Sequence, residues 1–222
     1  MTIAEPQRSH PSFPQQGWVA ALRGFTRKTS PVEAGRCELC GAEILPGHQH
    51  LVEPAGRRLL CCCQACAVLF SNQAAAKYRR VPERTELLRG FHMSDLQWDA
   101  LRIPIDLAFF FRSSTTQGVV GFYPSPAGAT ESLLSFAAWE ALVADNPMLA
   151  ELESDVEALL VNRLEEARGY YRVPIDRCYE LVGLIRAHWQ GLAGGAEVRD
   201  AIRNFFARIE EAARAPGLGS HA

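Results

Sequence analysis

The sequence lacks the short motifs by which many enzymes are recognised. It has no glycine-rich phosphate loop, no Gly-x-Ser-x-Gly nucleophile motif and no His-Glu-x-x-His metalloprotease motif. Acidic residues are abundant in the C-terminal half, but they recur at helical spacing, which is typical of solvated helix faces and not of a paired acid/base site. The sequence therefore gives no support to an enzymatic activity, and we expect a non-catalytic protein.

Long apolar runs are missing as well. No stretch approaches the roughly 20 apolar residues that a membrane-spanning helix needs, and the first residues, MTIAEPQRSHPSFPQQ, have no basic region followed by an apolar run. We expect no membrane span, no secretory signal and a cytoplasmic location. The hydrophobic content of 48% over 222 residues is nevertheless enough for a globular core.

A strong surplus of positive charge is also absent. Residues 1–90 carry 12 Lys and Arg against 7 Asp and Glu, while residues 91–222 carry 11 against 18. The basic surplus of the first part is modest, and the basic stretch YRRVPERTELLR (78–89) has no interleaved aromatic residues of the kind that single-strand binders use. We interpret it as a solvated face near a helix end, so nucleic acid is not the expected partner.

Cysteines, in contrast, are concentrated in one segment. Six of the seven lie between Cys37 and Cys66, in CELCGAEILPGHQHLVEPAGRRLLCCCQAC. Two Cys-x-x-Cys pairs, Cys37/Cys40 and Cys63/Cys66, are separated by 22 residues, a gap that lets two turns converge on one tetrahedral ion. The spacing predicts a metal site, with Zn²⁺ bound by four thiolates as the leading interpretation and iron in a rubredoxin-like site as the alternative.

The neighbouring residues leave the ligand set open. Cys61 could replace Cys63, and His48 or His50 could replace one sulfur. The blander interpretation places both histidines on the hairpin surface or in hydrogen bonds around the site. Cys62 is expected to be a free thiol under each of these assignments, because adjacent cysteines are awkward to bridge by a disulfide.

The spacing of the rest of this segment predicts a small module. Residues 48–53 and 57–62 read as two strands joined by a turn at 54–56, and an alanine-rich helix is expected after Cys63 with the second cysteine pair in its first turn. A knuckle, a hairpin and a helix in this order are typical of a treble-clef or zinc-ribbon module.

The remainder of the chain predicts strands followed by helices. We expect strands at 107–113, 118–123, 129–136, 155–163 and 170–173, the first three forming an antiparallel meander. Helices are expected at 137–144, 176–190 and 197–214, with Pro174 opening the second and Gly194-Gly195 ending it. Cys178 is expected in the core and His188 on a helix surface.

These patterns together predict an α+β protein. We divide it into a flexible N-terminal arm (1–34, with an apolar patch at 18–25), a cysteine-rich zinc-binding module with its helix (35–90), and an antiparallel-sheet domain with C-terminal helices (91–222).

The chain also resembles a bacterial family of unknown function whose members are encoded near [NiFe]-hydrogenase genes. The resemblance covers most of the chain and rests on CELCGAEI, HQHLVEP, RRLLCCCQACAVLF, GFYPSPAGATESLL, DVEALLVN and VPIDRCYELVGLIRAHWQG. The family's second cluster is similar to Cys-x-Cys-x-x-Cys, which matches Cys61, Cys63 and Cys66 and makes Cys61 a fifth candidate ligand.

The resemblance implies a setting and no mechanism. We expect an accessory protein that assists assembly, maturation or electron transfer of a [NiFe]-hydrogenase-type enzyme, with hydrogenase subunits or maturation factors as partners. The alternatives are a rubredoxin-like electron carrier and a nucleic-acid-binding zinc module.

Overall fold

A six-stranded antiparallel sheet forms the centre of the α+β domain. The computed structural model describes residues 35–71, 77–190 and 194–215, so the expected flexible arm and its apolar patch lie outside the described residues. The strands are β6 (Glu86–Leu87), β7 (Leu107–Ser113), β8 (Gly118–Ser125), β9 (Gly128–Glu131), β10 (Glu157–Asn162) and β11 (Gly169–Pro174), in the order β6-β11-β10-β7-β8-β9. Every neighbouring pair is antiparallel. The expected α+β class and the β7-β8-β9 meander are confirmed.

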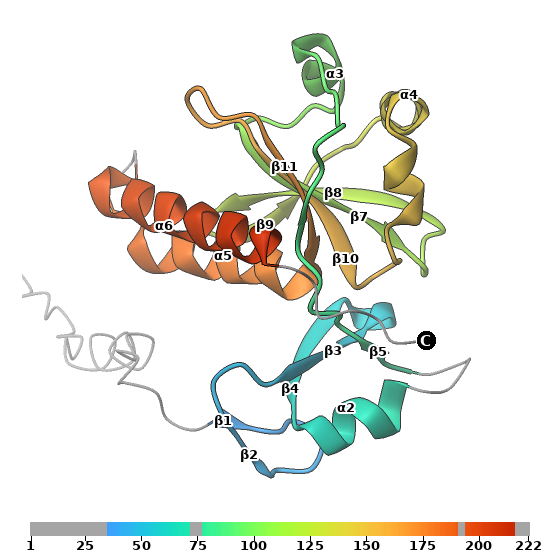
Figure 1. Ribbon diagram of the computed structural model, residues 1–222, viewed down its shortest axis with the longest axis vertical. Coiled ribbons are helices and arrows are strands. Elements are labelled where there is room, and N and C mark those ends of the chain that lie inside the picture. The colour runs from blue at the N-terminus through green and yellow to red at the C-terminus, as the bar shows by residue number, and fades with distance from the viewer. Residues whose placement is uncertain (1–34, 72–76, 191–193, 216–222) are drawn as a thin grey trace, which may run out of the picture. The chain divides into compact units, whose positions relative to one another are not determined.

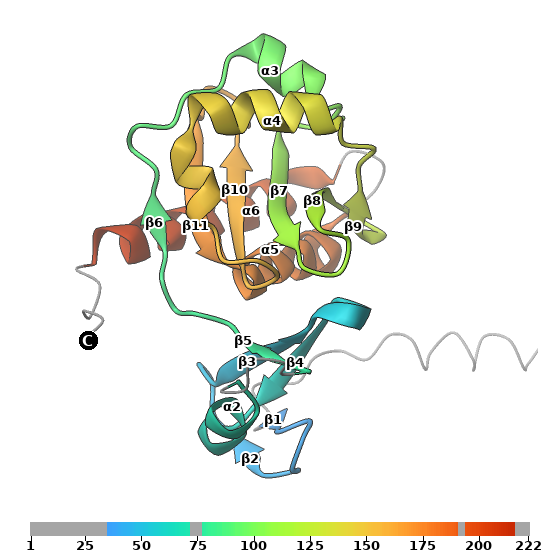
Figure 2. The ribbon, with the colours of Figure 1, turned by 90° about the vertical axis from the view of Figure 1, so that its right-hand side faces the viewer.

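Both faces of this sheet are buried. Along β7, Phe109 and Phe111 belong to one apolar cluster, whereas Ala108 and Phe110 belong to another. Successive side chains of a strand point to opposite faces, so the apolar run LAFFF fills two cores at once. Figures 1 and 2 show α5 and α6 against one face of the sheet and α3 and α4 against the other.

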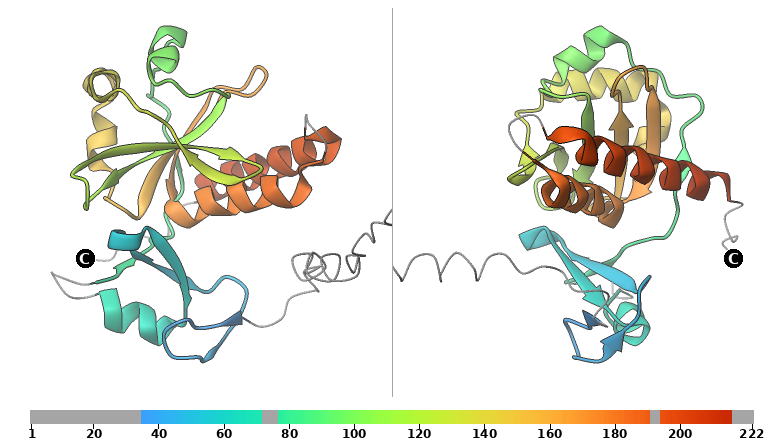
Figure 3. Two further views of the ribbon diagram at one scale, coloured as in Figure 1. Left: turned by 180° about the vertical axis from the view of Figure 1, so that it is seen from behind. Right: turned by 90° about the vertical axis from the view of Figure 1, so that its left-hand side faces the viewer.

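The helices supply the other side of each core. They are α3 (Asp95–Ala100), α4 (Phe136–Asp145), α5 (Ile175–His188) and α6 (Gly195–Arg214), with a 3₁₀ turn η2 (Pro147–Glu151) after α4. Helices α5 and α6 contact each other and contribute Cys178, Leu181, Phe205 and Phe206 to the first core, and Figure 3 shows the two side by side from behind. Cys178 is fully buried as expected, and His188 is half-buried, with its ring on the carbonyl of Leu184.

Several element boundaries differ from the expected ones, most of them by one or two residues. The third strand ends at Glu131 and not at residue 136, because Ser135 caps α4 by accepting a hydrogen bond from the backbone of Ala138. Gly194 does not end α5, which stops at His188; it has φ +82° and begins α6.

The cysteine-rich module has a smaller sheet and one helix. Its elements are β1 (Gly35–Arg36), β2 (Glu43–Ile44), β3 (Gln49–Glu53), the 3₁₀ turn η1 (Pro54–Gly56), β4 (Arg58–Cys62), α2 (Gln64–Ser71) and β5 (Arg79–Arg80). Strands β1 and β2 pair with each other, and the order of the second sheet is β4-β3-β5. The predicted hairpin and helix are present.

The basic stretch after α2 is largely exposed, as expected, but it is not a helix end. Arg79 lies in β5 and pairs with Glu153 at 2.8 Å and with Asp155 at 3.4 Å, and Arg84 pairs with Glu157 at 3.2 Å. The expectation was wrong because its partners come from a segment more than 70 residues away, which periodicity does not reveal.

Contacts within the chain group the described residues from Gly35 onward into one compact unit. The module has its own apolar cluster around Leu51, Leu60 and Cys62, while Val52 and Val81 pack into the first core of the large sheet. The division at residue 90 stays a prediction. None of the helices in the described segments has the length and apolar character required to cross a bilayer.

Candidate metal centre

The first cysteine pair sits on a tight turn between β1 and β2. The amide of Gly41 donates to the carbonyl of Cys37 at 2.8 Å, and the amide of Cys37 donates to the carbonyl of Ala42 at 2.7 Å. Gly41 has φ +77°, a conformation that glycine adopts without a Cβ clash. This turn holds the side chains of Cys37 and Cys40 on one side of the knuckle.

The second pair lies at the start of α2. The amide of Ala67 donates to the carbonyl of Cys63 at 2.9 Å, which closes the first helical turn. The amide of Cys66 lies 3.5 Å from the Cys63 sulfur and donates to it, so this sulfur acts as the cap of the helix. A helix N-terminus favours negative charge, and therefore thiolate over thiol.

The four sulfurs converge. One sulfur each from Cys37, Cys40, Cys63 and Cys66 lies within 4.8 Å of the other three, and the Cys40 and Cys63 sulfurs are 3.8 Å apart. Zinc–sulfur bonds of about 2.3 Å in a tetrahedron place the sulfurs about 3.8 Å apart. The donor set therefore fits a tetrahedral ion, and the cluster could hold a metal.

Hydrogen bonds from backbone amides favour the thiolate form of Cys37. Burial alone would raise the pKa of Cys37, but amides of Cys63, Cys40 and Leu39 donate to its sulfur and lower the pKa to about 6. For Cys66, burial and the neighbouring thiols raise the pKa well above its usual value. Four thiolates this close repel one another unless a cation lies among them. A bound cation would relieve that repulsion.

Cys61 and Cys62 do not belong to this cluster. In the β3–β4 register Cys62 faces Gln49 and Cys61 faces His50, and neighbouring residues of a strand point to opposite faces. Cys62 is fully buried, donates its S–H to the carbonyl of Gln49 at 3.3 Å, and has its pKa raised to about 11 by burial and nearby thiols. It is an inert core thiol.

Cys61 instead joins the two candidate histidines. One ligand atom each from His48, His50 and Cys61 lies within 4.8 Å of the other two, and the two imidazole rings are 4.7 Å apart between centroids. Burial, followed by the negative charges of Glu38 and Cys37, raises the pKa of Cys61. The structure thus separates the seven candidate ligands into a group of four sulfurs and a group of two nitrogens and one sulfur.

Comparison with protein families gives one match. The model of a family of unknown function, DUF5947, matches residues 36–213. The chain belongs to the DUF5947 family. No curated protein and no solved structure matches it.

One residue beside the candidate ligands of this DUF5947 chain was not predicted from its sequence. Asp176, in the first turn of α5, lies 2.9 Å from Nδ1 of His50 through its Oδ2 atom. The two residues are 126 positions apart. The aspartate lies within the string VPIDRCYEL, but nothing in its spacing links it to the histidines.

A cavity of about 340 Å³ lies elsewhere in this DUF5947 chain, and Arg89, Tyr171, Glu210 and Arg214 are among the residues lining it. The Tyr171 hydroxyl donates to Glu210 at 3.2 Å, and Arg214 pairs with the same carboxylate. Burial and the Glu210 charge raise the pKa of Tyr171 to about 12, so the phenol stays protonated near neutral pH. The polar groups here satisfy one another and do not form a poised acid/base pair.

Proposed function

We propose that this protein is a non-catalytic accessory protein in which Cys37, Cys40, Cys63 and Cys66 hold one structural Zn²⁺ in a treble-clef or zinc-ribbon module. The convergence of the four sulfurs carries the proposal. Zinc accepts tetrahedral thiolate ligands and brings no redox chemistry that the protein must control. The ion would hold the knuckle and α2 together where the module's apolar cluster is small.

The setting we propose is a [NiFe]-hydrogenase-type enzyme, whose assembly, maturation or electron transfer the protein assists. This part rests on the resemblance described above, whose strings all fall within residues 36–213, the range matched by the family. The proposed location is the bacterial cytoplasm.

Exposed apolar residues on α2 support the proposal that this protein binds another protein. Val68, Leu69 and Phe70 are consecutive, and their exposed fractions are 44%, 67% and 43%. Neighbouring exposed apolar side chains are typical of protein interaction sites. They adjoin Cys66 in sequence, so a partner bound at these residues would lie next to the metal centre.

The partner proposal is tested by affinity capture from the native host under gentle conditions. We expect the wild-type protein to recover a hydrogenase subunit or maturation factor, and a Leu69→Glu variant to lose it while keeping its metal. A Leu133→Glu variant is the matched control, because Leu133 is 87% exposed outside the module. Wild-type capture without any hydrogenase component contradicts the proposed setting.

A rubredoxin-like iron site is the second candidate. Cys40 is exposed, and amides donate to the sulfurs of Cys37 and Cys63, an arrangement that would also suit an electron carrier because it leaves one edge of the site near solvent. Elemental analysis with a visible spectrum separates the two, since ferric tetrathiolate is coloured and zinc is not. One colourless zinc per four-sulfur site is expected, and a stoichiometric coloured iron would replace the zinc proposal.

A nucleic-acid-binding role has less support. Arg79 and Arg84, which belong to the basic stretch that first suggested it, are paired with Glu153, Asp155 and Glu157. Binding to phosphates would require breaking these pairs. A titration with nucleic acid should show no affinity that falls steeply with salt.

A further inference from the structure

Three side chains outside the four-sulfur cluster lie close together, those of His48, His50 and Cys61. His48 directly precedes β3, His50 lies in β3, and Cys61 lies opposite His50 in β4. Residues two apart on a strand share a face, and directly opposed residues of an antiparallel pair have Cβ atoms about 4.5–5.5 Å apart. The hairpin register therefore places all three side chains on one face.

The hydrogen bonds of the histidines fix which ring nitrogens are free. Nδ1 of His48 lies 3.0 Å from the carbonyl oxygen of Leu45, and Nδ1 of His50 lies 2.9 Å from a carboxylate oxygen of Asp176. Both partners accept, so each Nδ1 carries the proton and donates. Each neutral imidazole then keeps a lone pair on Nε2, the atom that binds a metal.

The free nitrogen of His48 is an unexplained buried atom. Its Nε2 is buried and has no hydrogen-bond partner among the residues that the structure describes, and the same holds for Oδ1 of Asp176. Buried polar atoms are normally satisfied, because leaving one unpaired costs on the order of 1–3 kcal/mol. The unpaired Nε2 of His48 indicates that the cluster takes a ligand that accepts its lone pair.

The surroundings match those of known metal ligands. A ligating histidine commonly donates its second nitrogen to a backbone carbonyl or to a carboxylate, which fixes the ring and strengthens it as a donor. His48 has the first arrangement and His50 has the second. The thiol of Cys61, half-buried and within 4.8 Å of one ring nitrogen of each histidine, supplies a third, softer donor.

We propose that Nε2 of His48, Nε2 of His50 and Sγ of Cys61 form a second metal site, separate from the four-sulfur centre, for a divalent ion of the zinc class. Two imidazoles and one thiolate suit such borderline ions. Three protein ligands leave one tetrahedral position for water or an exchangeable ligand, which distinguishes this site from the closed four-sulfur centre. Asp176 is a positioning residue that orients His50.

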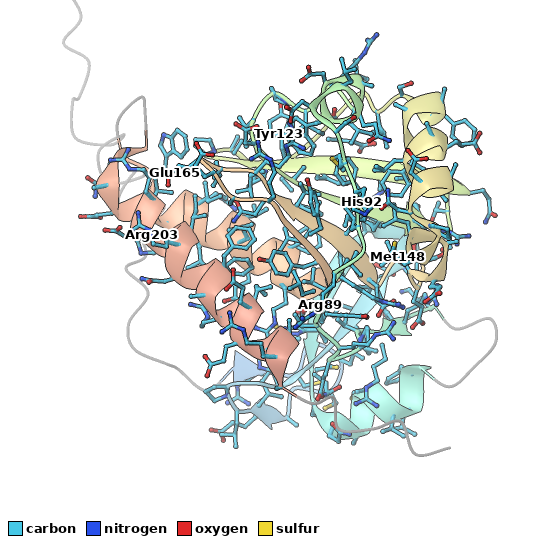
Figure 4. All side chains as sticks on the ribbon, turned by 45° about the horizontal axis from the view of Figure 1, so that its top comes forward. Arg89, His92, Tyr123, Met148, Glu165 and Arg203 are labelled. Carbon is cyan, nitrogen blue, oxygen red and sulfur yellow. The ribbon has the colours of Figure 1, made fainter. Side chains whose placement is uncertain are left out.

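The test counts zinc equivalents on the full chain, by titration of the metal-free protein against a chromophoric chelator. The wild type is expected to bind two equivalents. His48→Ala and Cys61→Ser variants are expected to bind one, and retention of that one shows that the four-sulfur module has folded. His92→Ala is the control, because this exposed histidine lies in the segment between β6 and α3, where Figure 4 labels it.

The role of Asp176 has its own readout. An Asp176→Asn variant should bind the second equivalent about 10–100-fold more weakly. With Co²⁺ in place of zinc at this site, the positions of its absorption bands should match the wild type because the ligands are unchanged. If Asp176 served only in packing, the variant would bind the second equivalent with the affinity of the wild type.

One result would overturn the proposal: His48→Ala and Cys61→Ser variants that both bind as many equivalents as the wild type. This comparison does not depend on which ion fills the four-sulfur centre. The site can therefore fail while the proposed function stands, and the converse also holds.

Discussion

Substitutions of Asp155 should separate three contributions to the free energy of unfolding: charge, hydrogen bonding and backbone conformation. Asp155 is 4% exposed and has φ +65°. One carboxylate oxygen accepts from the amide of Ser114 at 2.9 Å, and the other faces Arg79 of β5 at 3.4 Å. The aspartate thereby ties the cysteine module to the β7–β8 turn.

The cost of Asp155→Ala follows from these contacts. A hydrogen bond to a charged group contributes about 1.5–3 kcal/mol, and a left-handed backbone costs a residue with a Cβ about 1–2 kcal/mol, which aspartate and asparagine offset by local hydrogen bonds. The Arg79 pair adds little, because that side chain is 32% exposed and also pairs with Glu153. We expect a loss of about 2–4 kcal/mol in the free energy of unfolding.

Asp155→Asn is the matched control, since asparagine keeps the acceptor and tolerates the same φ. We expect it to lower the free energy of unfolding by about 1 kcal/mol, because the hydrogen bond is kept but its acceptor is no longer charged. Urea unfolding of the metal-loaded proteins, followed by circular dichroism, measures both. The reasoning is refuted if Asp155→Ala lies within about 0.5 kcal/mol of the wild type, or if asparagine is as damaging as alanine.

Other substitutions test the packing of the α+β domain by the same unfolding assay. A Cβ on Gly169 would lie 2.6 Å from the Tyr171 ring, so Gly169→Ala should destabilise the fold by about 1–3 kcal/mol; a stability equal to the wild type would contradict this packing. Gly183→Ala is its control on α5, where an added Cβ meets nothing within 4 Å, and should stabilise by about 0.5–1 kcal/mol. Glu157→Gln removes the carboxylate charge that faces the buried Arg172, which keeps a longer pair with Glu151 at 3.9 Å, and should cost about 1.5–3 kcal/mol; a cost below about 1 kcal/mol would show that the pair is dispensable.

The sequence predicts those strands whose apolar pattern lies within the strand itself. Runs such as LAFFF at β7 and ALLV at β10 are apolar on both faces of the sheet and favour strands, although the segment at β10 could also have been read as a helix. Strands β5 and β6 were not predicted, because each has two residues and is defined only by its pairing with β3 or β11. Arg79 and Arg80 of β5 were instead expected near a helix end.

The candidate site was likewise predicted from the sequence only in part. The two Cys-x-x-Cys pairs are visible in the sequence because each is local and the gap between them is short. Whether Cys61 or Cys63 joins them was left open; the structure places Cys63 among the four sulfurs and Cys61 opposite His50 in the β3–β4 register. The contact between Asp176 and His50 depends on how α5 packs against the module. That packing cannot be read from residue spacing in a single sequence.

X-ray absorption at the metal edge of a His48→Ala protein carrying one equivalent tests the four-sulfur centre most directly. The account predicts a zinc edge and four sulfur neighbours at about 2.3 Å. A first shell containing nitrogen, or fewer than four sulfurs, would contradict it.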